Sequence, residues 1–265
     1  MKKILFTVVV LVLLAAFGVS AFMVVNYLIE GREQANRYDE LSNIAANAQT
    51  ETTEAVAEAT EAADAETTAP TEEGGILPGY KEIYEMNDHV VGWIKMEGTK
   101  MDYPVMQSPE SENFYLYKNF DKKESSRGSI YAREVCDVNE PSDNITIFGH
   151  NMADGSMFAC LNAYTNKKAW DNNSLIFFDT LYEYHTYKIF AVFKTSANIG
   201  QGFSYHQFVD ASTEKEFNDF VATCKKLAFY DTGITPVYGD KLICLSTCEY
   251  TLENGRFVVA AVRIS

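Results

Sequence analysis

KLICLSTC at residues 241–248 and RFVVAAVRI at residues 256–264 are two apolar runs of strand length, and they decide the fold of the C-terminal region. Asn254 and Gly255, which lie between the runs, are a turn signal. If the runs pair as neighbouring antiparallel strands, a register centred on residue 252 sets Cys248 opposite Arg256. Directly opposed residues share one face of a sheet, with Cβ atoms about 5 Å apart. The sequence therefore predicts a thiol beside a guanidinium at the end of a strand pair.

Cys248 beside Arg256 suits nucleophilic catalysis, because a cationic partner favours the thiolate and stabilises negative charge that develops on a substrate. A buried structural thiol next to a surface arginine would give the same pattern, and these two residues alone do not separate the two interpretations. His150 favours the catalytic one. It follows an apolar strand at 144–148 and Gly149, which lets the backbone turn, so its side chain is well placed to line a cleft.

The remaining histidines and cysteines are interpreted as structural. His89 is expected in a polar turn, His185 within a strand and His206 in a long loop. The chain has 5 cysteines, an odd number that leaves at least one thiol unpaired, and no spacing among them is typical of zinc sites. Cys160 and Cys224 fall on apolar faces of helix-like segments, which favours buried thiols over a disulfide.

Short apolar runs separated by turn signals fill the region from residue 76 onward. They predict strands at residues 91–96, 103–107, 128–131, 144–148, 175–178, 184–194, 241–247 and 256–264. Eight strands with few long helices predict a mostly β fold, a closed or nearly closed eight-stranded β-barrel.

Two helices are predicted to interrupt the strands. One lies near residues 80–86, at the entrance to the domain. The other begins at Thr213, which forms a capping-box pattern with Glu216 between the sixth and seventh strands. A single apolar helical stripe follows, and it is interpreted as core contact: Phe217, Phe220, Val221, Cys224 and Leu227.

The N-terminal region predicts a membrane anchor at residues 1–29. Residues 4–25 carry no charge, and at about 1.5 Å per residue they span a hydrocarbon core of about 30 Å. Lys2 and Lys3 precede this run, which places the N-terminus in the cytoplasm and the rest of the chain outside a cell membrane that it crosses once. The alternative is a signal peptide cleaved near Ala21, but apolar residues continue to residue 29 and favour the uncleaved anchor.

Residues 30–75 form a predicted linker, and residues 76–265 form the folded domain. Residues 47–75 are rich in Ala, Thr and Glu and lack aromatic residues, which predicts a disordered spacer, with an Ala/Glu helix as the alternative. Much of the formal net charge of −15 falls in this linker. The acidic balance and the absence of a basic stripe argue against nucleic-acid binding.

Several motifs of the sequence resemble those of a known family. IFGHNM at residues 147–152 resembles the histidine motif of class B sortases, and LSTC at residues 245–248, followed by Arg256, resembles the sortase signature around the active-site cysteine. Further matches follow in the family's order: VGWI at 91–94, YPVMQ at 103–107, FYL at 114–116 and GSIY at 128–131. The resemblance covers residues 80–265. Cys244 departs from the usual Thr, and Phe148 from a frequent Tyr.

The resemblance implies a membrane-anchored cysteine transpeptidase with a sortase-like barrel. Cys248 would attack a Thr carbonyl in the C-terminal sorting motif of a surface protein and form a thioester. His150 would protonate the leaving amine and assist the incoming amine, and Arg256 would donate to the carbonyl or the oxyanion. Ser246, Thr247 and Glu249 are expected to contact substrate, and Glu249 either orients Arg256 or is a solvated loop carboxylate.

The resemblance also implies the partners. The acceptor is an amine of a peptidoglycan precursor or, in a pilin-polymerising enzyme, a lysine of another pilin subunit. No metal or organic cofactor is implied, and the N-terminal helix is the membrane contact.

Other classes of protein fit less well. In papain-like hydrolases the cysteine precedes the histidine, whereas His150 precedes Cys248 here. L,D-transpeptidases keep this order, but their cysteine has a Gly before it and an Arg shortly after it. A non-catalytic, membrane-tethered binding module explains the anchor, spacer and barrel, but not why His, Cys and Arg all fall at predicted strand ends.

Overall fold

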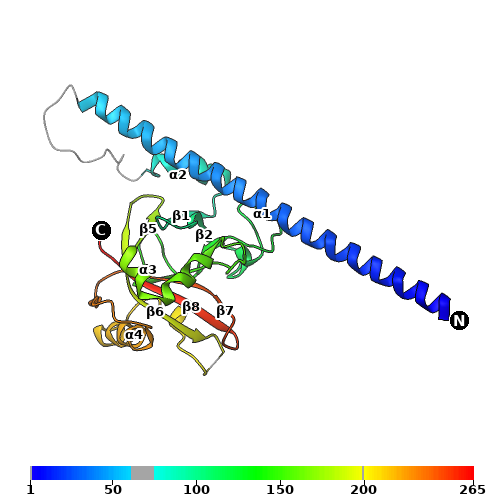
Figure 1. Ribbon diagram of the computed structural model, residues 1–265. Coiled ribbons are helices and arrows are strands. Elements are labelled where there is room, and N and C mark those ends of the chain that lie inside the picture. The colour runs from blue at the N-terminus through cyan, green and yellow to red at the C-terminus, as the bar shows by residue number, and fades with distance from the viewer. Residues whose placement is uncertain (1, 61–74, 199) are drawn as a thin grey trace. The chain divides into compact units, whose positions relative to one another are not determined.

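The computed structural model describes residues 2–60, 75–198 and 200–265, together with the side chains of these residues except those of 2 and 48–60 (Figure 1). By internal contacts the chain divides into two compact units, Met1–Glu40 and Leu41–Ser265. The second unit holds every strand found among the described residues.

Helix α1 (Lys2–Thr60) begins the chain. Within it, Lys3–Asn47 contains a stretch long and apolar enough to cross a membrane, a test that a signal sequence also passes. The disordered spacer that the sequence predicts from residue 47 is replaced by helix as far as Thr60, which follows the Ala/Glu alternative. Propagation of an existing helix by Ala and Glu is far easier than nucleation of a new one. Residues 61–74 lie outside the described residues.

The eight strands form a closed barrel in the order β1-β2-β3-β4-β7-β8-β6-β5. Neighbouring strands are antiparallel except for β2–β3 and β4–β7, which are parallel. The barrel predicted from the sequence is therefore confirmed. The strands are β1 (Val90–Lys95), β2 (Asp102–Met106), β3 (Ile130–Ala132), β4 (Asn144–Phe148), β5 (Leu175–Thr180), β6 (Thr186–Ser196), β7 (Leu242–Glu249) and β8 (Gly255–Arg263).

Strand β7 is buried on both faces along most of its length. Alternate residues, among them Leu242 and Cys244, join a cluster with buried side chains of α4 (Glu214–Leu227). Because successive side chains of a strand point to opposite faces, Ile243 and Leu245 face the other way, and both are fully buried. Burial on both faces explains why this strand is continuously apolar in the sequence.

Helix α4 lies between β6 and β7, as the sequence predicts. Thr213 caps it by accepting a hydrogen bond from the Glu216 N–H, while the Glu216 carboxylate accepts from the Ser212 N–H rather than from Thr213. Four of the five residues of the predicted stripe are buried. Leu227, the last, is 38% exposed, because the helix ends there and leaves the packed face.

The remaining helices are short. Helix α2 (Pro78–Met86) precedes the barrel, with Pro78 in its first turn. Helix α3 (Lys167–Asn172) and the 3-10 helices η1 (Phe114–Leu116), η2 (Phe158–Thr165) and η3 (Tyr205–Gln207) complete the fold. The sequence predicted a helix-like segment around Cys160, which lies in η2, and did not predict the other three elements. His185 lies just before β6 rather than within a strand, where its N–H donates to Asp179.

Candidate active site

The register of β7 and β8 is the one that the sequence predicts. Cys248 pairs with Arg256, and Thr247 pairs with Phe257. Asn254 adopts a left-handed backbone conformation, with φ +49°, in the connecting loop. A Cβ at Gly255 would lie 2.5 Å from the Glu249 carbonyl oxygen, so only glycine fits there without a shift of the loop. The loop residues therefore fix the register that brings Cys248 and Arg256 together.

His150 reaches the same end of the barrel from β4. Phe148 at the end of β4 pairs with Ser246, and the Gly149 N–H then donates to the Ser246 carbonyl at 3.1 Å. A Cβ at Gly149 would lie 2.5 Å from the side chain of Ile130 and 2.8 Å from that of Phe158. Close packing therefore requires glycine before His150, whereas the φ of Gly149 is not positive and needs no special freedom to turn.

The orientation of the His150 ring is set by a backbone carbonyl. Nε2 of His150 lies 2.8 Å from the carbonyl oxygen of Leu116 in η1. A carbonyl only accepts, so Nε2 carries a proton in either charge state of the ring. Nδ1 is then the nitrogen that gains or loses a proton. Tyr117 packs near the ring, with centroids 6.2 Å apart.

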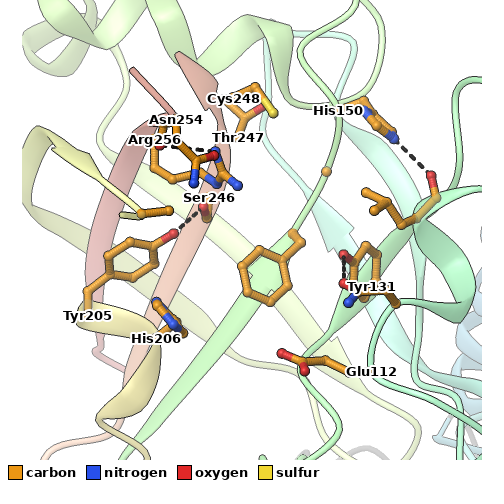
Figure 2. A pocket seen from close by; sticks show the side chains of 15 residues that line it. Glu112, Tyr131, His150, Tyr205, His206, Ser246, Thr247, Cys248, Asn254 and Arg256 are labelled. Atoms are coloured by element: carbon orange, nitrogen blue, oxygen red, sulfur yellow. Dashed lines mark hydrogen bonds between the residues drawn. The ribbon is translucent and has the colours of Figure 1, made fainter. Parts of the chain in front are cut away.

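These residues surround a cavity of about 330 Å³ at the end of the barrel. In Figure 2, Cys248 and Arg256 lie on one side of it and His150 on the other, while Glu112 and His206 lie at the far end. Its walls come from segments far apart in the sequence, including the ends of β4, β7 and β8 and the 3-10 helices η1 and η3. The polar or aromatic lining residues include Glu112, Tyr131, His150, Tyr205, His206, Ser246, Thr247, Cys248 and Arg256.

The Arg256 guanidinium is held by its own turn. It donates to the Asn254 side-chain oxygen at 3.1 Å and to the Gly255 carbonyl at 2.9 Å. Within the part of the chain that the structure describes, no carboxylate forms an ion pair with Arg256. The arginine thus lines the cavity with its charge not neutralised by a carboxylate.

Ser246 and Thr247 line the cavity, whereas Glu249 does not. Ser246 is hydrogen-bonded to the Tyr205 hydroxyl. The Thr247 hydroxyl is buried and has no hydrogen-bond partner among the described groups. Glu249 is also buried, but its carboxylate accepts from Lys194 and Thr251 and from the loop backbone. It therefore holds the loop and neither orients Arg256 nor is solvated.

Hydrogen bonding sets the ionisation of Glu249. Burial disfavours its charged form, but the bonds from Lys194, from the Thr251 side chain and from two loop N–H groups outweigh burial and lower the pKa of Glu249 to about 2. The carboxylate is therefore ionised throughout the neutral range.

Several cavity residues were missed by sequence reasoning. His206, assigned to a loop, lies in η3 and lines the cavity, and burial lowers its pKa. Tyr205 is 2% exposed, and burial raises its pKa to about 12. Tyr131 and Glu112 come from β3 and from the segment before η1. Tyr131 ends the GSIY match but was not assigned to the site, and no local pattern marks the other three residues, because the loop packing that brings them to β7 is long-range.

The other cysteines lie away from the cavity. All five are free thiols, as favoured for Cys160 and Cys224. Burial raises the pKa of each of the four thiols outside the cavity, to about 11 for Cys160. Cys244 is fully buried in the body of β7, so its departure from the family pattern is a packing difference.

The fold and the matched motifs define the class of protein. The sortase domain family matches residues 94–264, and the chain therefore belongs to the sortase family of cysteine transpeptidases. Within this family, its named relatives are sortase B enzymes.

Sortase B of Listeria monocytogenes is 30% identical over 70% of this chain and 74% of its own length. Sortase B of Staphylococcus aureus is 26% identical over 70% of this chain and 75% of its own. The solved structure of Bacillus anthracis sortase B in complex with AAEK1 is 26% identical, with a TM-score of 0.71, and covers 90% of this chain and 99% of that one.

Proposed function

We propose that this chain cleaves a C-terminal sorting motif of surface proteins at a threonine carbonyl and transfers the acyl group to an amine of a cell-wall precursor. The observation that carries the proposal is the convergence of Cys248, His150 and Arg256 on one cavity. Membership of the sortase family supplies the reaction class.

Cys248 is the proposed nucleophile. Its thiolate sulfur forms a bond to the threonine carbonyl carbon, and the carbonyl electrons move onto oxygen. Arg256 donates hydrogen bonds to this oxygen. Because no carboxylate neutralises the charge of its guanidinium, that charge can stabilise the oxyanion. When the oxyanion collapses, the peptide C–N bond breaks and leaves a thioester on Cys248.

His150 is the proposed acid and base. The leaving nitrogen takes a proton from the imidazolium as the C–N bond breaks. The resulting neutral ring accepts a proton from the incoming amine, which attacks the thioester and releases the Cys248 thiolate. The bond to the Leu116 carbonyl supports this role, because it keeps the ring oriented through both steps.

Ser246 and Thr247 are proposed to contact the bound peptide. Both line the cavity next to Cys248, and the buried Thr247 hydroxyl has an unused hydrogen-bonding capacity. Glu249 is not proposed as a substrate contact, since its carboxylate is already engaged by Lys194 and the loop.

The apolar part of α1 is proposed to anchor the chain in the cell membrane, with the N-terminus in the cytoplasm and the barrel outside. Lys2 and Lys3 before the apolar run support this orientation. Residues 30–75 are proposed to link the membrane segment to the catalytic domain 76–265. Protease digestion of intact cells tests this arrangement: the barrel should be degraded while an epitope fused before Met1 is protected.

The activity test uses the full-length protein in detergent micelles with fluorogenic peptides that span sorting motifs. Three acceptors are compared: a short glycine peptide, a stem-peptide amine and a lysine-containing pilin peptide. We expect cleavage and an acceptor-linked product in the wild type and in Cys160→Ala, a matched control at a thiol outside the cavity. Cys248→Ala should be inactive. Equal cleavage by wild type and Cys248→Ala would contradict the proposal, and transfer only to the pilin peptide would identify a pilin-polymerising enzyme.

A further inference from the structure

Asn151 directly follows His150, and its side chain contacts the residue that carries the nucleophile. Nδ2 of Asn151 donates to the Cys248 carbonyl oxygen at 3.0 Å. Asn151 is half-buried, and it does not line the cavity. The contact therefore acts on the strand that carries the thiol, not on the space that a substrate would fill.

This hydrogen bond continues the β4–β7 ladder after the backbone ladder has ended. The last described main-chain bond between these strands runs from the Gly149 N–H to the Ser246 carbonyl. In a parallel ladder the next bond donated in the same direction lies two residues further along each strand, from the N–H of residue 151 to the carbonyl of residue 248. The Asn151 side chain takes this place, while its backbone forms a bridge with Met157. His150 lies between the two bonds that join this segment to β7.

Further contacts fix the orientation of the Asn151 amide. Nδ2 of Asn162 donates to Asn151 Oδ1 at 2.9 Å and to the Ala159 carbonyl at 3.1 Å. A backbone carbonyl lies at each end of this chain of bonds, and carbonyls only accept, so both amides have a single orientation. The Tyr250 hydroxyl also donates to the Asn151 carbonyl, at 3.3 Å. The segment after His150 is thus tied to β7 and to the loop that follows it.

We infer that Asn151 is a positioning residue that sets the placement of His150 relative to Cys248. The inference rests on the catalytic roles proposed above for those two residues. Without the hydrogen bond from the Asn151 side chain, the segment 150–157 is no longer held to the Cys248 carbonyl by a side chain. Displacement of a catalytic group by about 1 Å reduces a rate by about 100-fold.

The kinetic test compares full-length Asn151→Ala and Asn151→Asp with wild type in detergent micelles. We expect kcat to fall by about 10- to 100-fold in Asn151→Ala, with KM changed less than about twofold because the cavity wall is intact. Asn151→Asp is similar in shape but presents a carboxylate to the Cys248 carbonyl and cannot donate, so its kcat should fall at least as far. Wild-type kcat in either variant would overturn the inference.

Asn166→Ala is the matched control for a general loss of stability. The Asn166 side chain accepts from the Lys168 N–H at 3.0 Å and caps α3, so this variant also loses one hydrogen bond to the backbone. It should lower the melting temperature and leave kcat within about twofold of wild type. If Asn166→Ala reduced kcat as much as Asn151→Ala at an equal loss of melting temperature, Asn151 would be merely structural and the inference would fail.

A second readout needs no substrate. The rate of Cys248 alkylation by iodoacetamide is followed by peptide mass spectrometry as a function of pH. The titratable or charged groups that face the cavity or interact with the thiol are His150, Arg256, Glu112, His206, Tyr131, Tyr205 and Tyr250. Release of the segment that carries His150 changes the surroundings of the thiol, so the rate profile of Asn151→Ala should differ from that of wild type. An unchanged profile would overturn the inference, and wild-type chain that is alkylated but cleaves no peptide would instead refute the proposed function.

Discussion

Cys244 and Cys248 are four residues apart on the same face of β7, yet their surroundings differ. Cys244 is fully buried in the cluster that includes α4, and burial raises the pKa of its thiol. Cys248 is half-buried and lines the cavity with Arg256 and His150. The same strand therefore provides a packed body and an open end.

The surroundings of Cys244 and Cys248 differ because different elements pack against the two residues. Phe217 and Cys224 of α4 share a buried cluster with Cys244, whereas Cys248 lies where the barrel ends and a loop begins. A thiol becomes useful for catalysis where it is reachable and has cationic or basic neighbours. The following predictions test how completely the body and the end of β7 are separated in function.

The largest effect is expected when the two thiols are removed in turn. Cys248→Ala should reduce peptide cleavage by about 1,000-fold or more, because no other side chain at the cavity replaces the nucleophile. Cys244→Ala should keep kcat within about tenfold and lower stability by about 1–2 kcal/mol, because it leaves a small cavity in the core. Cleavage rates and urea unfolding measure both effects. A catalytic loss in Cys244→Ala as large as that in Cys248→Ala would show that the two positions are not separate.

Arg256 should give the next largest effect. Arg256→Ala should lower kcat by about 100- to 1,000-fold, through loss of oxyanion stabilisation, and Arg256→Lys should recover only part of the rate. Asn254→Gly is the matched control, since it removes one contact to the guanidinium and permits the positive φ. It should cost less than about tenfold. Steady-state kinetics that found Arg256→Ala no slower than Asn254→Gly would exclude the proposed role.

Gly149 tests the close packing before His150. In Gly149→Ala the new methyl group would meet Ile130 and Phe158, at 2.5 and 2.8 Å. We expect a loss of about 1–3 kcal/mol in the free energy of unfolding, measured in urea. Gly98→Ala serves as control, because a Cβ there meets nothing within 4 Å, although its positive φ adds some strain. A Gly149→Ala protein more stable than Gly98→Ala would contradict the packing argument.

The smallest effect is expected at Glu249, as a dependence of stability on pH. Its pKa falls from an ordinary 4.5 to about 2 on folding, so the stability it contributes is present above pH 4.5 and is lost as the pH falls towards 2. The melting temperature of Glu249→Gln should therefore fall by a few degrees less than that of wild type between pH 5 and pH 2. Glu253 is an exposed loop carboxylate. The melting temperature of Glu253→Gln should therefore change with pH as that of wild type does. Parallel curves for Glu249→Gln and wild type would exclude this role.

At the open end of β7, the pairing with β8 could be predicted from the sequence, whereas the pairing with β4 could not. The pairing of Cys248 with Arg256 follows from two apolar strands and one turn, all local in sequence. The parallel pairing of β4 with β7, which brings His150 to the thiol, joins segments far apart in the chain. In the sequence, His150 and Cys248 were linked only by their positions at predicted strand ends and by the family resemblance.

Other features depend on packing that no local pattern encodes. The carbonyl of Leu116 and the ring of Tyr205 reach the cavity from 3-10 helices whose sequences carry no periodic signal. From the sequence, Glu249 was interpreted as a loop carboxylate. Only its ion pair with Lys194, which lies in β6 on the far side of β8, shows why it is buried. Leu227 fits the α4 stripe but lies where the helix leaves the core.

The most direct measurement of the central claim is the mass of the full-length protein after it reacts, in the absence of an amine, with an intact sorting peptide that it cleaves. We expect an adduct equal to the acyl part of the peptide, located on Cys248 by peptide mapping. Hydroxylamine or a glycine peptide should release it, as expected for a thioester. Continued cleavage with an adduct on another residue, or with no adduct on Cys248 under rapid quenching, would contradict the proposed mechanism.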